Sequence, residues 1–232
     1  MALCDEFFQS GVSWAVTFRR EVQQCQAFII DAMAVVGEPW RLTHDEVQGM
    51  LIKPNQASLL VIDVQDKLIG AVSDPVGTLA RTRWLLAATH ALGVPTVFSE
   101  QYPKGLGHTV AALIEASPAA QVVEKLHFSC VAANCLPASL LAREQVVVCG
   151  METHVCVLQT VLGLRELGKQ VFVVEDACDS RTSASKAAGI ARMRDAGAQI
   201  VTREMVLFEW MESSSHEQFR PISKNYIVPG DL

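Results

Sequence analysis

Short apolar runs alternate with helix-like segments over most of the chain. From residue 58 onward, six runs rich in Val, Ile and Leu end near Gly, Pro or charged residues, which is typical of strands buried on both faces. The predicted strands are 58–63, 94–99, 121–124, 144–149, 170–174 and 199–202. The segments between them carry the start and stop signals of helices. These helices are expected at 75–92, 108–115, 134–142, 153–167, 182–196 and 204–211.

This alternation predicts an α/β fold. Buried strands joined by helical crossovers form a parallel sheet with helices on both faces. We therefore expect a three-layer, doubly wound, Rossmann-like sandwich around a six-stranded, mainly parallel sheet. Ligands of such sheets bind at the carboxyl ends of the strands, so the residues at those ends are the first candidates for chemistry.

The first 49 residues do not follow this alternation. They are rich in aromatic residues and Gln, and residues 11–34 have the composition of one or two helices. Two interpretations are open. Residues 1–49 are an N-terminal extension, helical or loosely packed, attached to a compact domain at 50–232, or they pack on that domain as an ordinary extra helix.

Composition narrows the class of protein. The chain has 232 residues, of which 50% are hydrophobic and 19% charged, so it can bury a sizeable core and is not globally disordered. The net charge of −6 argues against nucleic acid as a partner, because phosphate binding needs a basic face. No apolar run approaches the ~20 residues that span a bilayer, and the positive start of a secretory signal is missing. We expect no membrane partner.

Seven cysteines are present, and no two of them form a CxxC pair. An odd number of thiols without a metal-ligand spacing is typical of a reduced, cytoplasmic protein. Most of these thiols are expected to be buried and inert. This group includes Cys130, Cys135, Cys149 and Cys178.

Three strand ends carry groups of complementary chemistry. Asp63 ends the first strand, Lys125 ends the third, and the turn after the fourth leads to Cys156. Thr153 is predicted to be the N-cap of the helix that follows, which would favour a Cys156 thiolate near the positive end of that helix. The set suits acyl transfer, in which the thiol attacks an amide and Asp63 passes its proton to the leaving amine. Taken singly, each residue also fits a structural role: a buried thiol, a loop-capping carboxylate and a solvated lysine.

Three segments give the chain a family resemblance. Leu60–Gln65, Glu124–Ser129 and Gly150–Cys156 resemble the matching segments of the isochorismatase-like cysteine hydrolases, the superfamily that includes nicotinamidases. The loop Glu100–Gly107 is similar to that of the subgroup containing the human isochorismatase-domain proteins. The resemblance covers roughly residues 50–225 and implies the isochorismatase-like hydrolase fold.

The resemblance also implies a catalytic site. Cys156 would be the nucleophile, Asp63 the general base, and Lys125 the group that holds the thiolate and orients the base. A cis peptide between Met151 and Glu152 would aim the amides of Glu152 and Cys156 at the developing oxyanion. The side chains expected to line the substrate pocket are those of Gln65, Tyr102, Phe128, His154 and Val155.

One departure from the superfamily concerns metal. Nicotinamidases bind a metal through an Asp-x-His pair after the second strand, and the segment Ser99–His108 lacks that pair. We therefore expect no metal, and nicotinamide is disfavoured because its ring nitrogen would lose an anchor. True isochorismatases lack the cysteine nucleophile, so Cys156 argues against isochorismate as well. No other cofactor is expected, because Gly105-Leu106-Gly107 lacks the third glycine of a dinucleotide fingerprint.

These observations favour one function over another. The favoured function is a metal-independent cysteine hydrolase that cleaves a small amide or related C–N bond through a thioester intermediate. The alternative is a non-catalytic binding or scaffold protein on the same fold. In both cases the expected partners are a small molecule and further copies of the chain, assembled as a homo-oligomer.

Overall fold

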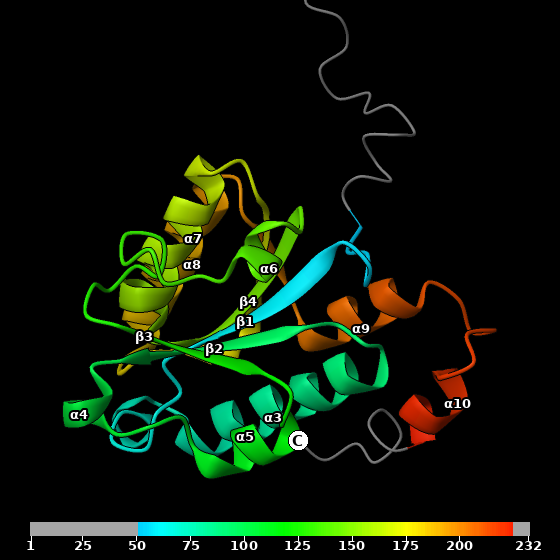
Figure 1. Ribbon diagram of the computed structural model, residues 1–232, viewed down its shortest axis with the longest axis horizontal. Coiled ribbons are helices and arrows are strands. Elements are labelled where there is room, and N and C mark those ends of the chain that lie inside the picture. Colours follow the sequence, from blue (N-terminus) through cyan, green and yellow to red (C-terminus); the bar gives the residue numbers. More distant parts are fainter. Residues whose placement is uncertain (1–50, 225–232) are drawn as a thin grey trace, which may run out of the picture. The chain divides into compact units, whose positions relative to one another are not determined.

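One parallel sheet organises the computed structural model, which describes residues 51–224 (Figure 1). The sheet order is β3-β2-β1-β4-β5-β6, and every pairing is parallel. Its strands are β1 (Ala57–Ile62), β2 (Thr96–Gln101), β3 (Gln121–Lys125), β4 (Gln145–Met151), β5 (Gln170–Asp179) and β6 (Gln199–Val201). The predicted fold class is confirmed. The prediction for residues 1–49 lies outside the described residues.

Helices cover both faces of the sheet (Figure 1). One face carries α3 (Pro75–Ala91), α5 (Ala111–Ala116) and α9 (Arg203–Met211). The other face carries α6 (Ala138–Leu141), α7 (Leu158–Glu166) and α8 (Ser183–Asp195). The shorter elements are η2 (Ile69–Ala71), α4 (Pro103–Leu106), η3 (Thr153–Val157) and α10 (Phe219–Ile222). None of the helices within residues 51–224 has the length and apolar character needed to cross a membrane.

The central strands are buried on both faces. Every residue of β1 and every residue of β4 is buried, which explains why their sequences read as unbroken apolar runs. The chain runs outward from β1 to β3 and then returns to β4, so the strand order reverses between β1 and β4. In doubly wound sheets this reversal opens a crevice at the carboxyl ends of the strands.

Several predicted elements have different bounds because of long-range contacts. The helix predicted from residue 108 begins at Ala111, since Thr109 pairs with Gln65 in an antiparallel bridge and the Val110 N–H donates to the Val64 carbonyl. The helix predicted at 134–142 is only α6, because Asn134 has a left-handed φ of 51° and Pro137 is the N-cap.

Two strands extend past their predicted ends. β2 runs to Gln101 because it pairs with β3 as far as Lys125. β5 runs to Asp179, where it pairs with the end of β4 after an irregularity between Val148 and Gly150. Both extensions add polar residues to the edge of the sheet where ligands bind.

Gly150 lies where β4 passes closest to β1. Its φ is +120°, a backbone conformation that residues other than glycine rarely adopt. A Cβ built there would lie 2.1 Å from the Ile62 carbonyl oxygen. The three atoms nearest to this Cβ are the backbone O, N and C of Ile62, and backbone atoms cannot move aside as a flexible side chain would. A side chain at position 150 would therefore force β1 and β4 apart.

We predict that Gly150→Ala lowers the free energy of unfolding by more than about 3 kcal/mol, or prevents folding, because it combines backbone strain with a clash. Gly70→Ala is the matched control, since its Cβ would meet nothing within 4 Å. Its effect should stay within about 0.5 kcal/mol. Urea unfolding followed by circular dichroism measures both variants, and equal stability would contradict the steric argument.

Candidate active site

A buried ion pair joins the ends of β1 and β3. The Lys125 Nζ donates to Asp63 Oδ2 at 2.6 Å and to the Gln101 Oε1 at 2.8 Å. The side chains of Lys125 and Asp63 are 0% and 1% exposed. Charges buried this deeply need partners, and the two opposite charges supply them for each other.

The Asp63 carboxylate is the point where the site's polar groups meet. Its Oδ1 accepts a hydrogen bond of 2.7 Å from the Ser99 hydroxyl, and the Cys156 thiol also hydrogen-bonds to the carboxylate. Asp63 has a left-handed φ of 53°, so the chain turns sharply as β1 ends. The structure thus brings Asp63, Lys125 and Cys156 together from three distant segments.

The turn that carries Cys156 differs from the predicted one. Thr153 is not the N-cap; its hydroxyl donates to the Asp179 carbonyl at 2.9 Å, and Glu152 occupies the cap position. The first turn, η3, is a π-helix, and α7 begins after it at Leu158. A π-turn widens the helix where the buried Cys156 side chain faces Asp63.

The surroundings of Cys156 oppose the predicted thiolate, because their net effect is to raise the pKa of its thiol. Burial raises the pKa of Cys156 well above its usual range, and the negative charge of Asp63 raises it further. Lys125 acts in the opposite direction and is outweighed. The macrodipole argument fails here because desolvation of a buried thiol exceeds the effect of a helix end.

The two members of the ion pair are also shifted. Burial raises the pKa of Asp63, against the opposing effects of Lys125 and Ser99. For Lys125, burial lowers the pKa, but the charge of Asp63 outweighs it and the net direction is upward. A carboxylate with a raised pKa next to a protonated thiol is suited to take up the thiol proton.

Two residues of the site were missed by the sequence-based prediction. Ser99 and Gln101, which contact Asp63 and Lys125, both belong to β2. The rule that ligands gather at strand ends applies to β2 as it does to its neighbours. The predicted strand ends at residue 99, however, so Gln101 lies outside it, and neither a hydroxyl nor an amide belongs to the set of carboxylate, ammonium and thiol that suits acyl transfer.

Gln65 holds the rim of the site in place. Its Nε2 donates to the carbonyls of Gln101 and Gly107 at 3.0 and 2.6 Å, and its Oε1 accepts from the Gln101 N–H at 2.7 Å. The side chain is fully buried. This use of the amide differs from the predicted contact with substrate.

The turn before Cys156 carries the remaining predicted groups. The peptide bond between Met151 and Glu152 is cis. The Glu152 carboxylate pairs with the exposed Arg181, at 2.6 Å to Nη2 and 3.0 Å to Nε. The His154 Nδ1 lies 3.0 Å from the Ser180 Oγ, and His154 and Val155 are both half-buried.

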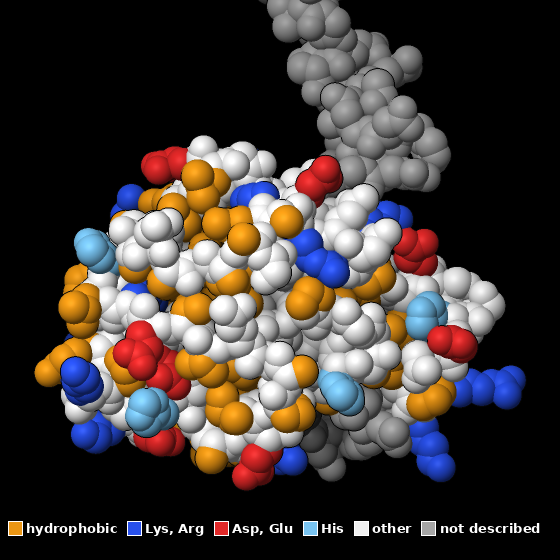
Figure 2. Space-filling model, viewed as in Figure 1, with side chains coloured by type: hydrophobic (Ala, Val, Ile, Leu, Met, Phe, Trp, Pro, Cys, Tyr) orange, Lys and Arg blue, Asp and Glu red, His pale blue; other side chains and the backbone are white. Residues whose placement is uncertain are grey.

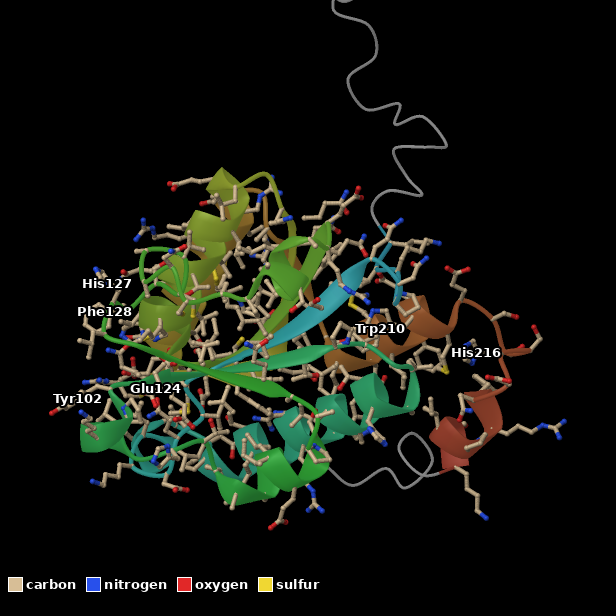
Figure 3. The ribbon with its side chains drawn as sticks, viewed as in Figure 1. Tyr102, Glu124, His127, Phe128, Trp210 and His216 are labelled. Atoms are coloured by element: carbon tan, nitrogen blue, oxygen red, sulfur yellow. The ribbon has the colours of Figure 1, made fainter. Side chains whose placement is uncertain are left out.

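Two aromatic side chains stand at the outer rim. Tyr102 follows β2 and Phe128 follows β3, and both lie at the same end of the molecule (Figure 3). They are 50% and 52% exposed, and Leu126 beside them is 74% exposed. Hydrophobic side chains also mark this end of the surface in Figure 2. The predicted pocket residues Tyr102 and Phe128 thus lie at the rim and not in the buried part of the site.

A further buried carboxylate, that of Glu100, lies near the end of β2. The Glu100 Oε1 accepts from the Thr109 N–H and hydroxyl at 2.7 and 2.9 Å, and its Oε2 lies 2.9 Å from the His108 Nδ1. These bonds use both carboxylate oxygens. Within residues 51–224, no group of three or more His, Cys, Asp or Glu side chains has the arrangement of a metal site.

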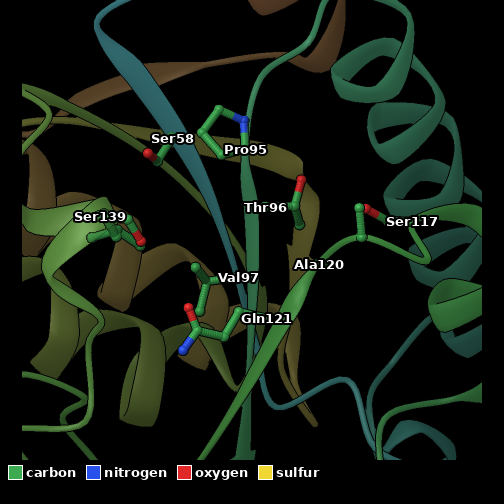
Figure 4. Close-up of a pocket in the computed structure, with 10 residues that line it drawn as sticks. Ser58, Pro95, Thr96, Val97, Ser117, Ala120, Gln121 and Ser139 are labelled. Atoms are coloured by element: carbon green, nitrogen blue, oxygen red, sulfur yellow. The ribbon is translucent and has the colours of Figure 1, made fainter.

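A cavity of about 260 Å³ lies at the amino-terminal ends of the strands, away from the ion pair (Figure 4). It is lined by the amino-terminal residues of three strands, Ser58, Thr96 and Gln121, and by Ser139 of α6. The candidate triad of Asp63, Lys125 and Cys156 lies at the other end of the sheet, at the carboxyl ends of β1 and β3 and in the turn after β4. We therefore place the candidate site at the triad, where reactive groups converge, and not at this cavity.

Known proteins share both the sequence and the architecture. Residues 57–205 match the model of the isochorismatase domain. Isochorismatase domain-containing protein 2 of Bos taurus is 38% identical over 178 residues, 75% of this chain and 84% of the relative. The MAR1 ribonuclease of Caenorhabditis elegans has a structure with a TM-score of 0.71 at 33% identity, covering 78% of this chain and 97% of that one. YcaC of Pseudomonas aeruginosa, with covalent acrylamide, has a TM-score of 0.70 at 25% identity, covering 81% and 94%.

We predict that Lys125→Met costs about 3–5 kcal/mol of stability, because it leaves Asp63 buried without its counter-charge. The folded-state pKa of Asp63, already above 3.8, should rise further. The folded state then binds more protons than the unfolded state, so the stability deficit grows as pH rises above the unfolded value. Urea unfolding at about pH 5 and about pH 8 measures this trend.

The double variant Asp63→Asn/Lys125→Met is the control for the ion pair. It removes both charges, so it should lose less stability than the single lysine variant at the higher pH. A deficit that is the same at both pH values would contradict the proposed coupling.

Proposed function

The chain belongs to the isochorismatase family, and from that premise we propose that it is a cysteine hydrolase. It cleaves a small amide or related C–N bond, without a metal, through a thioester on Cys156. The observation that carries the proposal is the Asp63 carboxylate, which contacts both the Cys156 thiol and the Lys125 ammonium. A scaffold protein would have no need to bury these three groups together.

The first half-reaction forms the thioester. Asp63 takes the thiol proton as the Cys156 sulfur attacks the carbonyl carbon, and the carbonyl electron pair moves to oxygen. The tetrahedral intermediate then collapses, the C–N bond breaks, and the leaving amine takes the proton from Asp63. Because burial raises the pKa of the Cys156 thiol, we place proton transfer and attack in one step.

The second half-reaction releases the acid. Asp63 takes a proton from water as the water oxygen attacks the thioester carbonyl. The C–S bond then breaks, and the Cys156 sulfur takes that proton from Asp63, which restores both the thiol and the carboxylate. Lys125 holds the carboxylate in place and balances its charge through both halves. Gln101 and Ser99 fix the orientation of the pair, since each donates to or accepts from one of its members.

The site that binds the oxyanion is assigned to the turn after β4. The backbone N–H groups of Glu152 and Cys156 are proposed as its donors, since both belong to the turn that presents the nucleophile. His154 and Val155 of the same turn, with Tyr102 and Phe128 at the rim, are proposed to contact the substrate. The half-exposed aromatic residues suit a small molecule with an apolar portion.

A structural neighbour supports the nucleophile. YcaC of Pseudomonas aeruginosa carries covalent acrylamide, an electrophile that reacts with nucleophilic side chains such as thiolates. On this chain the buried Cys156 is the thiol that contacts a base. We propose that it reacts with such electrophiles in the same way.

The exposed apolar rim also supports the predicted homo-oligomer. Leu126, Phe128 and Tyr102 gather beside β3, an edge strand of the sheet, together with the 43% exposed Val122. Exposed apolar groups next to an unpaired strand edge are typical of a contact surface between copies. We propose that this surface joins copies of the chain.

We predict that Cys156→Ala lowers hydrolysis of a responsive small amide by at least about 1000-fold. Rates across a panel of small amides, with mass spectrometry of the Cys156 peptide to trap the thioester, measure the effect. Cys149→Ala is the control, because Cys149 is a buried thiol of β4 that contacts neither Asp63 nor Lys125 in the described interactions. Hydrolysis retained by the Cys156 variant would overturn the assignment, and an unmodified, inactive wild-type chain would favour a binding protein.

We further predict that the acid limb of kcat/KM lies above 3.8, because Asp63 must be ionised to take the thiol proton and burial raises its pKa. The rate should therefore rise with pH through the raised value. A pH profile measured with a neutral amide tests this. An acid limb at the ordinary carboxyl value would contradict the role of Asp63.

A further inference from the structure

Two further thiols lie next to the triad, in the loop between β3 and α6. Cys130 is fully buried and Cys135 is half-buried. Their side chains hydrogen-bond to each other, and the Cys135 Sγ lies 3.5 Å from the Cys130 carbonyl oxygen. Neither thiol takes part in the hydrolytic steps above.

The loop backbone holds the two cysteines face to face. The Cys135 N–H donates to the Cys130 carbonyl at 3.3 Å, and the left-handed Asn134 turns the chain back just before Cys135. The Cys130 N–H donates to the Thr160 Oγ1 at 3.0 Å, which anchors the loop on α7. A disulfide requires two cysteines that are close in space, and both the N–H and the Sγ of Cys135 contact the Cys130 carbonyl while the thiols are reduced.

The two thiols differ in acidity. The hydrogen bond from Cys135 lowers the pKa of Cys130 to about 7, and the charge of Lys125 and a hydrogen bond with Ser99 act in the same direction. The same hydrogen bond raises the pKa of Cys135. Cys130 is therefore the thiol of the pair that ionises more easily, and a thiolate beside a second thiol is the combination that reacts with a peroxide and then closes to a disulfide.

We propose that Cys130 and Cys135 are an oxidative modification site, which a hydroperoxide converts to a reversible disulfide. With hydrogen peroxide, the Cys130 sulfur attacks one oxygen, so an S–O bond forms, the O–O bond breaks and one water leaves. The Cys135 sulfur then attacks the Cys130 sulfur, so the S–S bond forms, the S–O bond breaks and the second water leaves. Two thiols are oxidised and one peroxide is reduced.

The modification would act on the triad through electrostatics. The Cys130 sulfur interacts with both Lys125 and Cys156. A disulfide is uncharged, so oxidation removes a negative charge from their surroundings. This inference does not depend on hydrolysis, because the disulfide forms whether or not the triad turns over a substrate.

The sequence makes the disulfide easy to detect. Trypsin cuts after Lys125 and after Arg143, and the peptide between them contains Cys130 and Cys135 as its two cysteines. The native full chain is treated with dilute hydrogen peroxide, alkylated with iodoacetamide and digested. We expect this peptide to escape alkylation and to be lighter by the mass of two hydrogen atoms, with full reversal by dithiothreitol. Cys178, fully buried and with its pKa raised to about 12, should remain reduced as the internal control.

Two variants separate the pair from nonspecific oxidation. The disulfide cannot form in the variant Cys135→Ser. Cys135→Ala is a second version, for use if the serine variant folds poorly. Cys130 should then accumulate as a sulfenic acid that dimedone traps. If the peptide stays doubly alkylated in the wild type while the Cys156 peptide gains oxygen, the proposal is wrong. It is equally wrong if the disulfide appears only after unfolding in urea.

Discussion

The contact between Lys125 and Asp63 is the interaction on which the rest of the site depends. It joins β3 to β1 across the end of β2, with both charged groups removed from water. Neither group would be stable there alone, because an unpaired buried charge costs several kcal/mol. The pair therefore fixes the positions of Gln101 and Ser99 on the intervening strand, and it supplies the carboxylate that Cys156 contacts.

The opposite side of the site is held by a second buried carboxylate. Asp179, at the end of β5, accepts from the Ser73 hydroxyl and the Asp74 N–H, each at 2.8 Å. Its backbone carbonyl accepts from Thr153, the first residue of the π-turn. The start of α3, the end of β5 and the nucleophile turn are thus joined at one residue. Together with Gly150, which lets β4 approach β1, this network determines where Cys156 lies.

The electrostatics of the site follow from burial more than from helix position. Desolvation raises the pKa of both Asp63 and Cys156, while the neighbouring Cys130 ionises more easily because it has a hydrogen-bonding thiol partner. The acidic thiol and the nucleophile are therefore different residues. The nucleophile lies beside its base, and the more acidic Cys130 lies on the neighbouring loop.

The sequence by itself determined the layered parallel sheet, because buried strands and crossover helices can be recognised from the local spacing of apolar residues. It also determined that Asp63, Lys125 and Cys156 would meet, since parallel strands place their carboxyl ends at one edge. The tertiary structure decided what depends on distant partners: the extensions of β2 and β5, the π-turn at Thr153 and the buried role of Gln65. It also decided the raised pKa of Cys156 and the contact of Cys130 with Cys135. These features arise from desolvation and from hydrogen bonds, many of them between residues far apart in the sequence. Burial and such contacts are set by the folded structure and cannot be read from the order of the amino acids.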